Sequence, residues 1–181
     1  MLKSKIRKKI LKIRKEKNKK NINFPFSKIY KEINKVNSKK KIIGGYYPVN
    51  FEINTLDFIK DLEMKGHRTC LPVIKKNNQM DFYYWSTKDI LNINKFGIPE
   101  PKKKILAFPD IILVPLVAFD NRLYRIGYGG GYYDRYLEKL SIKKKFLKIG
   151  LAHSCQKINR IPINKYDKKL DIVITEKYIL K

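Results

Sequence analysis

The sequence is poor in several kinds of residue and segment, and each shortage excludes a class of protein. It has 2 cysteines in 181 residues, Cys70 and Cys155, so it is not a small disulfide-stapled secreted domain. The longest apolar run, from Ile111 to Phe119, is interrupted by Pro115 and is too short to span a membrane. The basic N-terminus is not followed by an apolar segment, which argues against a secretory signal. We therefore expect a cytoplasmic protein.

Acidic residues are scarce as well. The 16 Asp and Glu face 42 Lys and Arg, which gives a formal net charge of +26. Lysine, asparagine and isoleucine are abundant, and these are the residues that AT-rich codons supply. We therefore attribute the charge first to codon bias and only second to a polyanionic partner. A hydrophobic content of 43% and an aromatic content of 12% are sufficient for a core and argue against disorder.

The order of apolar segments and turn signals predicts one α/β domain over residues 1–181, with a mostly parallel sheet flanked by helices on both faces. Isoleucines 6, 10 and 13 form a stripe at i, i+4 and i+7, which predicts an N-terminal basic helix over residues 1 to about 20. Further helices are expected at residues 27–37, 55–65 and 132–140. Strands are expected at residues 42–47, 68–74, 81–85, 111–114, 146–152 and 171–175. Residues 86–104 are expected to form a loop, because Pro99 and Pro101 exclude a continuous helix.

A cluster of glycines carries the strongest chemical signal. Gly127, Gly129, Gly130 and Gly131 lie between an extended stretch, residues 116–126, and the helix expected to begin near Tyr132. A glycine-rich turn before a helix exposes backbone N–H groups and allows close approach of an anion. The cluster is neither a Walker P-loop nor a dinucleotide-binding fingerprint.

Charged residues flank this cluster. Arg125 and Arg135 are suited to bidentate contacts with phosphate oxygens. Asp134 is the type of residue that binds Mg²⁺ beside a nucleotide. The pattern predicts a phosphate or carboxylate site, with or without a divalent metal. A glycine-rich hairpin whose tyrosines only pack is the alternative.

The two segments Pro115 to Asp120 and Arg125 to Leu137 resemble the signature of the 5-formyltetrahydrofolate cyclo-ligases, also called 5,10-methenyltetrahydrofolate synthetases. Other blocks follow in the order of that family: Lys3 with Arg7, Tyr46 to Pro48 with Glu52, Met80 to Trp85, Phe96 to Pro101, Gly150 to Ala152 with Gln156, and Asp167 before Leu170 to Glu176. The resemblance implies conversion of 5-formyltetrahydrofolate and ATP, with magnesium, to 5,10-methenyltetrahydrofolate, ADP and phosphate. It also implies that the formyl oxygen is phosphorylated and that N10 then attacks the formyl carbon.

The resemblance also implies a role for each matching residue. ATP would contact Lys3, Arg7, Arg125, Gly127, Gly129, Gly130, Gly131, Tyr132 and Tyr133. The folate, as monoglutamate or polyglutamate, would contact Tyr47, Glu52, Trp85, Tyr128 and Tyr132. Asp134 and Asp167 would hold Mg²⁺, and Arg125, Arg135 and Asp134 would act in catalysis. For Trp85 we weigh core packing almost equally with a folate contact.

Two positions depart from the family pattern. His153 stands where an aromatic such as Phe or Tyr is expected, and Gly130 stands where some members carry Lys. We expect a monomer that binds neither a membrane nor a specific nucleic acid. A basic nucleic-acid-binding protein is the main rival interpretation. A zinc protein that uses His67, Cys70, His153 and Cys155 is the weaker one, because these spacings suit tetrahedral ligation poorly.

Overall fold

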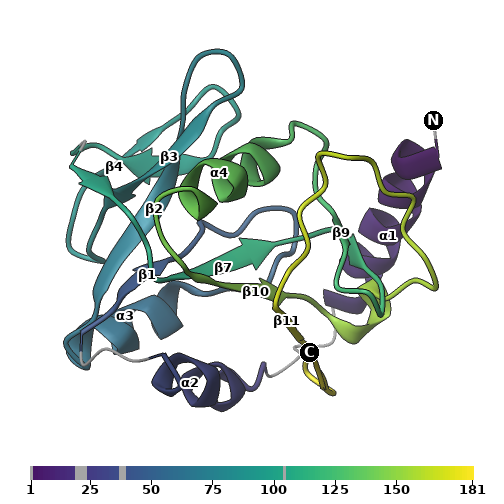
Figure 1. Ribbon diagram of the computed structural model, residues 1–181, viewed down its shortest axis with the longest axis horizontal. Helices are drawn as coiled ribbons and strands as arrows, with labels where there is room; N and C mark the ends of the chain where they lie inside the picture. The colour runs from purple at the N-terminus through teal and green to yellow at the C-terminus, as the bar shows by residue number, and fades with distance from the viewer. Residues whose placement is uncertain (1, 19–23, 37–39, 104) are drawn as a thin grey trace.

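The computed structural model describes residues 2–18, 24–36, 40–103 and 105–181. An eight-stranded sheet with the order β12-β11-β10-β7-β1-β2-β3-β6 forms its centre (Figure 1). Its parallel strands are β1 (Ile42–Gly44), β2 (Arg68–Ile74), β7 (Ile111–Pro115), β10 (Leu147–Leu151) and β11 (Ile172–Ile174). Its antiparallel strands are β12 (Ile179–Leu180) at one edge, and β3 (Met80–Tyr84) and β6 (Leu106–Ala107) at the other. The mostly parallel sheet predicted from the sequence is confirmed.

Strand β7 shows how the sequence builds the two layers around this sheet. Successive side chains of a strand point to opposite faces, and a strand covered on both faces is apolar throughout. Ile111 and Leu113 pack on the face covered by α2 (Phe26–Asn34) and α3 (Leu56–Met64). Ile112 and Val114 pack on the face covered by α4 (Tyr132–Ser141). Helices therefore cover both faces, as expected (Figure 1).

Helix α1 (Leu2–Asn18) packs apart from these layers, against the hairpin of β8 (Ala118–Phe119) and β9 (Arg125–Ile126) (Figure 1). The isoleucine stripe forms the contact: Ile10 is buried, and Ile6 and Ile13 are half-buried against the same cluster. The basic helix predicted from the stripe is thus a packed part of the domain. None of the described helices is long and apolar enough to cross a membrane.

Segments 86–104 and 116–126 differ from the expectation. Residues 86–104 are not only a loop, since β4 (Leu91–Ile93) pairs with β5 (Pro99–Pro101). A two-stranded ladder tolerates proline because each strand has a free edge. The Asn94 side chain makes the turn by accepting hydrogen bonds from the N–H groups of Phe96 and Ile98. Residues 116–126 are not one extended stretch, because buried Asp120 accepts hydrogen bonds from the N–H groups of Arg122 and Tyr124 and so folds the chain into the β8–β9 hairpin.

The ends of some predicted elements also differ. The strand expected over residues 42–47 ends at Gly44, and the helix expected over residues 27–37 ends at Asn34. Residues 19, 20 and 37, where we placed helix ends, lie outside the described residues. The short strand β12 and a 3-10 helix over Ser154–Gln156 were not anticipated, because segments this short have no clear periodicity.

Candidate active site

A cleft of about 1730 Å³ opens at the carboxyl ends of β1, β2 and β7, which is where α/β proteins place their ligand sites. Its walls come from α1, the segment after β1, the β2–β3 turn, the β4–β5 hairpin, the glycine-rich segment and residues 164–168. Every predicted site residue except Trp85 lines this cleft. The fold therefore gathers residues from position 3 to position 167 around one space.

The glycine-rich segment joins β9 to α4 along one wall of the cleft. Gly129 and Gly131 have φ values of 109° and 67°, which glycine adopts without strain. A Cβ atom on Gly131 would lie 2.7 Å from Nη1 of Arg135, and one on Gly129 would lie 3.3 Å from Nη2 of Arg7. Two guanidinium groups therefore lie against this backbone. Together with the N-terminus of α4, they make the wall a site for an anion.

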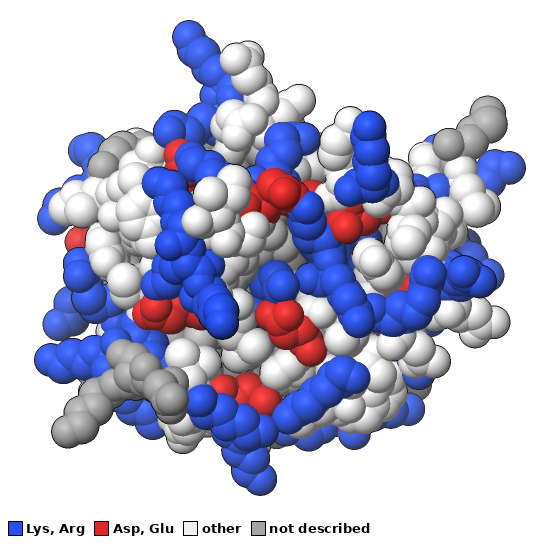
Figure 2. Space-filling model, viewed as in Figure 1, with Lys and Arg blue, Asp and Glu red and all other residues white. Residues whose placement is uncertain are grey.

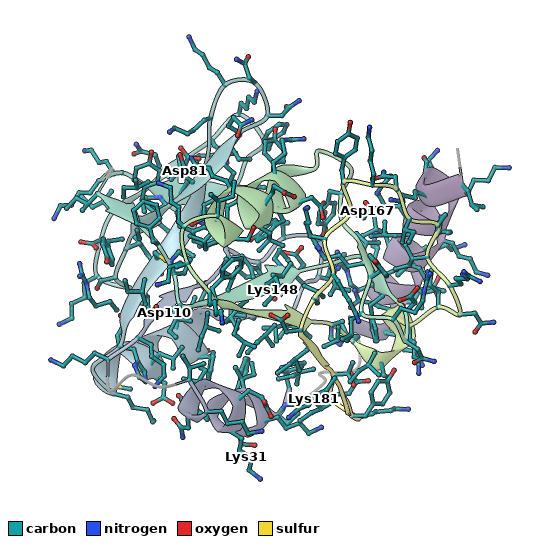
Figure 3. All side chains as sticks on the ribbon, in the orientation of Figure 1. Lys31, Asp81, Asp110, Lys148, Asp167 and Lys181 are labelled. Atoms are coloured by element: carbon teal, nitrogen blue, oxygen red, sulfur yellow. The ribbon has the colours of Figure 1, made fainter. Side chains whose placement is uncertain are left out.

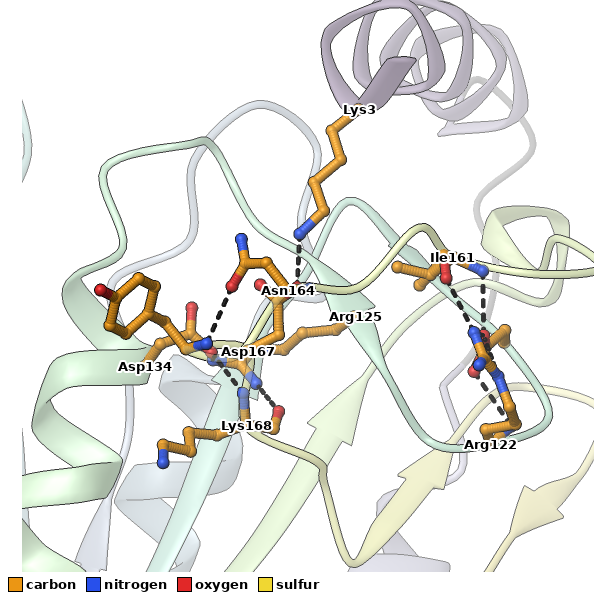
Figure 4. Close-up of polar contacts among 10 residues, drawn as sticks. Lys3, Arg122, Arg125, Asp134, Ile161, Asn164, Asp167 and Lys168 are labelled. Carbon is orange, nitrogen blue, oxygen red and sulfur yellow. Dashed lines mark hydrogen bonds and ion pairs between the residues drawn. The ribbon is translucent and has the colours of Figure 1, made fainter. Parts of the chain in front are cut away.

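Helix α1 brings two cations to the cleft. Lys3 and Arg7 lie one turn apart on the same face of the helix. Arg7 donates a hydrogen bond from Nε to the carbonyl oxygen of Gly127 at 2.7 Å, and Lys3 Nζ lies 2.6 Å from Oδ2 of Asp167. Figure 4 shows Lys3 extending from α1 toward Asp167. The helix thus reaches both the glycine-rich segment and the loop that carries Asp167.

The two arginines that flank the glycines differ in their surroundings. Arg125 is buried, and its guanidinium donates to Oδ1 of Asp134 at 2.8 Å and to the carbonyl oxygen of Lys168 at 2.5 Å (Figure 4). Arg135 is exposed at the rim of the cleft, where Nε and Nη2 donate to the carbonyl oxygen of Asn78. Arg125 is therefore held firmly inside the protein, whereas Arg135 is accessible to a ligand.

The two predicted metal ligands each keep one carboxylate oxygen available. Oδ1 of Asp134 accepts hydrogen bonds from Arg125 and from the Lys168 N–H, and Oδ2 of Asp167 accepts from Lys3 and from the Asn164 N–H. The other oxygen of each carboxylate accepts no hydrogen bond from the described part of the chain. One or two carboxylates, completed by phosphate oxygens and water, are the usual ligands of Mg²⁺. The donor set therefore fits magnesium.

The residues of the zinc hypothesis do not form a site. In the described ranges, no group of three or more His, Cys, Asp or Glu side chains is arranged to hold a metal ion. Cys70 and Cys155 are both free thiols, and Cys70 is buried among core residues. His153, which departs from the family pattern, is buried beside the 3-10 helix, and burial lowers the pKa of its imidazole.

On another wall of the cleft, Glu52 follows a tight turn. Asn50 and Phe51 both have positive φ, 48° and 62°, which is costly for residues other than glycine. The Val49 N–H donates to Oε2 of Glu52 at 2.9 Å, whereas Oε1 is buried and accepts no hydrogen bond of normal geometry from the described residues. The turn thus holds one oxygen of this carboxylate ready for a ligand.

Burial is the main electrostatic influence on Glu52. It raises the pKa of this carboxyl to about 7, although the Val49 N–H, the charge of Arg14 and the Tyr128 hydroxyl lower it in part. Near neutral pH, Glu52 therefore exchanges readily between its charged and neutral forms. Such a perturbed carboxyl in a cleft is typical of a functional residue.

Aromatic and apolar side chains also line the cleft. Tyr47, Tyr128 and Tyr132 face the cleft, and the ring of Tyr132 lies edge-on to that of Phe96 with a centroid separation of 6.4 Å. Pro72, Ile74, Met80 and Ile98 complete the apolar lining. Flat rings and a few polar groups at the ends suit a ligand that is itself aromatic in part.

Trp85 corrects one of our expectations. It does not line the cleft but packs in a separate cluster with Ile59 and Leu71, and its indole N–H donates to the carbonyl oxygen of Asp89 at 3.3 Å. As the last residue before a turn at the end of β3, it points to the α3 side of the sheet. Core packing, the alternative weighed above, describes its position.

Two residues at or beside the cleft were not anticipated from the sequence. Arg14 is buried in the helix face that also carries Ile10, and Tyr46 lines the cleft while its hydroxyl donates to the carbonyl oxygen of Ile53 at 2.9 Å. The spacing of Arg14, seven residues after Arg7 and four after Ile10, places it on the packed face of the helix. That spacing was the signal available in the sequence.

Basic side chains cover much of the surface seen in Figure 2, and acidic side chains form small patches between them. Several acids have a lysine beside them, as in the pairs Lys139–Asp81, Lys144–Asp110 and Lys148–Asp171. Figure 3 shows Asp167 on the side of α4 that faces α1, whereas Asp81 lies on the other side. On the face shown, the positive charge is spread out and does not form a single stripe.

Comparison with known proteins gives consistent matches along the chain. A model described as the 5-formyltetrahydrofolate cyclo-ligase family matches residues 1–176. The chain is 35% identical over 142 residues to a 5-formyltetrahydrofolate cyclo-ligase of Haemophilus influenzae, covering 74% of this chain and 75% of the relative. It is 33% identical over 137 residues to the Mycoplasma pneumoniae protein of the same name, covering 75% and 73%.

Two solved structures share the fold. The NMR structure of Aquifex aeolicus 5,10-methenyltetrahydrofolate synthetase aligns with a TM-score of 0.74 and 30% identity, covering 100% of this chain and 93% of that one. The structure of a 5,10-methenyltetrahydrofolate synthetase from Mycoplasma pneumoniae aligns with a TM-score of 0.69 and 26% identity, covering 97% and 99%. Sequence and structure comparisons thus agree over nearly the whole chain.

Proposed function

The chain belongs to the 5-formyltetrahydrofolate cyclo-ligase family and is a ligase, and we propose that it uses ATP and magnesium to convert 5-formyltetrahydrofolate to 5,10-methenyltetrahydrofolate. The observation that carries this proposal is the set of groups that share one cleft. The cations of α1, the glycine-rich segment, the buried carboxyl of Glu52 and several aromatic rings all line it. At about 1730 Å³, the cleft exceeds the usual size of a site for one small ligand and has room for two.

ATP binds, in this proposal, at the end built by α1 and the glycine-rich segment. Lys3, Arg7 and Arg135 supply positive charge, and the segment from Gly127 to Tyr133 supplies backbone N–H groups. Arg125 lies behind this wall and orients Asp134. Gly130 leaves this segment without the lysine that some family members carry, so α1 and Arg135 provide the flexible cations.

Asp134 and Asp167 would hold Mg²⁺, which neutralises phosphate charge when it is bound. Each of these carboxylates is paired with a cation before the nucleotide arrives, Asp134 with Arg125 and Asp167 with Lys3. These two pairs place cations and carboxylates side by side, and Arg7 and Arg135 add further positive charge. Phosphate and metal would enter this arrangement together.

The folate binds beside Glu52, and we refer to this part of the cleft as the folate end. Oε1 of Glu52 is available to accept hydrogen bonds from the amino-pyrimidinone edge of the pterin, which presents N–H donors. Tyr47, Tyr128 and Tyr132 provide flat walls for its rings.

The reaction needs positioning and neutralisation of charge more than a protein nucleophile. The formyl oxygen forms a bond to the γ-phosphorus, the bond from that phosphorus to the bridging oxygen breaks, and ADP leaves. N10 then bonds to the formyl carbon, its proton passes to solvent, and phosphate leaves with the former formyl oxygen. The carbon ends as the methenyl bridge between N5 and N10. Arg7 and Arg135 stabilise the transferring phosphoryl group.

We also propose that the protein is a cytoplasmic monomer. Its two cysteines are both free thiols, as a reducing compartment maintains them.

A label test separates this mechanism from simple ATP hydrolysis. 5-Formyltetrahydrofolate labelled with ¹⁸O in the formyl group should yield inorganic phosphate that carries the label, with one ADP formed for each methenyl product. Phosphate without the label, or ADP formed in the absence of folate, would contradict the proposal.

A further inference from the structure

Arg14 is a fully buried cation that the proposed function does not yet use. Its side chain is 1% exposed, which makes it the most buried charged residue in the described part of α1. Nη1 donates to the carbonyl oxygen of Leu116 at 3.1 Å, and Nη2 donates to the hydroxyl oxygen of Tyr128. Leu116 follows β7 and Tyr128 belongs to the glycine-rich wall of the cleft, so one guanidinium joins α1 to both segments.

The direct partners of Arg14 do not neutralise its charge. Both acceptors are neutral oxygens, and Nε is buried and donates no hydrogen bond to the residues that the structure describes. A buried guanidinium is strongly disfavoured without a compensating anion, and an apolar side chain would pack there more favourably. Glu52 is the carboxylate whose pKa responds to Arg14. The charge of Arg14 thus favours the charged form of Glu52.

The hydrogen bond from Arg14 also fixes the direction of the Tyr128 hydroxyl. A phenol has one O–H donor and accepts through its oxygen. Because Nη2 donates to that oxygen, the O–H must point away from Arg14. The carboxyl of Glu52 and the hydroxyl of Tyr128 interact: Glu52 raises the pKa of Tyr128, and the Tyr128 hydroxyl lowers that of Glu52. Tyr46 and Tyr133 are the other titratable groups that respond to Glu52.

We propose that Arg14 is a positioning residue for the folate end of the cleft: it directs the Tyr128 hydroxyl and supplies the positive charge that opposes Glu52. The inference rests on the proposed role of Glu52 in folate binding. Arg14 does not line the cleft itself and acts through these two residues. One helix would then serve both substrates, with Lys3 and Arg7 at the nucleotide end and Arg14 at the folate end.

Binding measurements on Arg14→Met test this role, with Lys12→Met, which removes an exposed charge from the same helix, as the matched control. Calorimetry between pH 6 and 8.5 gives the dissociation constants of 5-formyltetrahydrofolate and of magnesium-ADP. For Arg14→Met we expect folate affinity to fall at least tenfold and nucleotide affinity to stay within twofold. The pH below which folate binding is lost should also move upward. Arg14→Lys keeps the charge but not both hydrogen bonds, so it should bind folate weakly with little change in that pH.

Other results overturn the inference. Equal losses of folate and nucleotide affinity would mean that Arg14 only holds α1 in place, and unchanged folate affinity would mean that it has no role in this end of the cleft. If Arg14→Met does not fold, Arg14→Lys and Tyr128→Phe decide the matter, since both should weaken folate binding selectively. A wild-type protein that does not bind folate would overturn the proposed function as well, whereas normal wild-type binding with unaffected variants overturns this inference alone.

Discussion

Lys3 Nζ lies 2.6 Å from Oδ2 of Asp167, although 164 positions separate the two residues in the sequence. This ion pair joins the first turn of α1 to the loop that precedes β11, and it closes one side of the cleft. In the proposed function, the same two residues meet the nucleotide and its metal. The pair therefore connects the placement of α1 with the binding of both.

Lys3→Met should weaken nucleotide binding. A charge-assisted hydrogen bond contributes about 1.5–3 kcal/mol, so we expect the dissociation constant of magnesium-ADP to rise roughly tenfold to a hundredfold. Calorimetry measures this change directly. Lys9→Met, which removes an exposed lysine from the same helix, is the control and should change the constant little. Equal losses in both variants would show that only the overall positive charge attracts the nucleotide.

Asp134→Asn should lower turnover about a hundredfold or more while the fold is retained. Asparagine keeps an oxygen that accepts from Arg125 and from the Lys168 N–H, but it loses the negative charge that would bind Mg²⁺. A magnesium titration of the residual activity should reach its midpoint at a higher concentration. Asp171→Asn, at the start of β11 and outside the cleft, is the comparison. An unchanged magnesium midpoint would remove Asp134 from the metal site.

The pKa of Glu52 predicts how folate binding depends on pH. Burial raises this pKa to about 7, so the carboxylate predominates above that pH and the neutral acid below it. If the carboxylate accepts hydrogen bonds from the pterin, the affinity for 5-formyltetrahydrofolate should fall as pH drops through about 7. Calorimetry gives the folate dissociation constants of wild type and of Glu52→Gln at each pH. The variant should bind folate weakly, and its affinity should not change with pH. A wild-type affinity that is constant from pH 6 to 8 would contradict the role of Glu52.

The same pKa predicts a cost in stability. A carboxyl whose pKa is raised in the folded state contributes most stability below its ordinary pKa of 4.5, and this contribution is lost as pH rises through about 7. The difference between the two values corresponds to roughly 3 kcal/mol. Glu52→Gln should therefore raise the free energy of unfolding relative to wild type at pH 8, and the gain should shrink toward pH 5. Urea denaturation at pH 5 and pH 8 measures the difference in unfolding free energy between the variant and wild type. The same difference at both pH values would contradict the raised pKa of Glu52.

Trp85→Phe should affect stability and not catalysis. Trp85 packs with Ile59 and Leu71, away from the cleft, so the smaller ring leaves a cavity in that cluster. We expect a loss of about 1–3 kcal/mol in the free energy of unfolding, with the KM for folate within twofold of wild type. Tyr132→Leu, in the cleft wall, should instead raise the KM for folate and leave the free energy of unfolding nearly unchanged. A raised KM for folate in Trp85→Phe, with an unchanged free energy of unfolding, would indicate that Trp85 contacts the folate.

Strong periodicity made much of the fold predictable. The apolar run of β7 and the isoleucine stripe of α1 each indicated the correct element, because burial on two faces or on one helical face leaves a clear pattern. Strands β4, β5 and β12 are three or two residues long and were missed. In such short strands the turn chemistry, such as the side-chain bonds of Asn94, decides the structure more than the pattern does.

The candidate site was predictable wherever residues lie in one motif. The glycine-rich segment indicated an anion site by itself, whereas Glu52 and Asp167 were connected to it only by resemblance to the family. Their closeness to the motif arises from the sheet topology, which a single sequence does not reveal. Arg14 was overlooked because a charged residue was expected on the solvent face of the helix. Trp85 was placed wrongly because a strand aromatic has the same pattern whether it faces a ligand or the core.

The most direct test of the account is an assay of the purified protein with 5-formyltetrahydrofolate, ATP and magnesium. Methenyltetrahydrofolate absorbs near the visible region, so its formation can be followed continuously. The account predicts that absorbance rises only when all three components are present, and that heat-inactivated protein gives no signal. No rise above the heat-inactivated control, or a rise that does not require ATP, would contradict it.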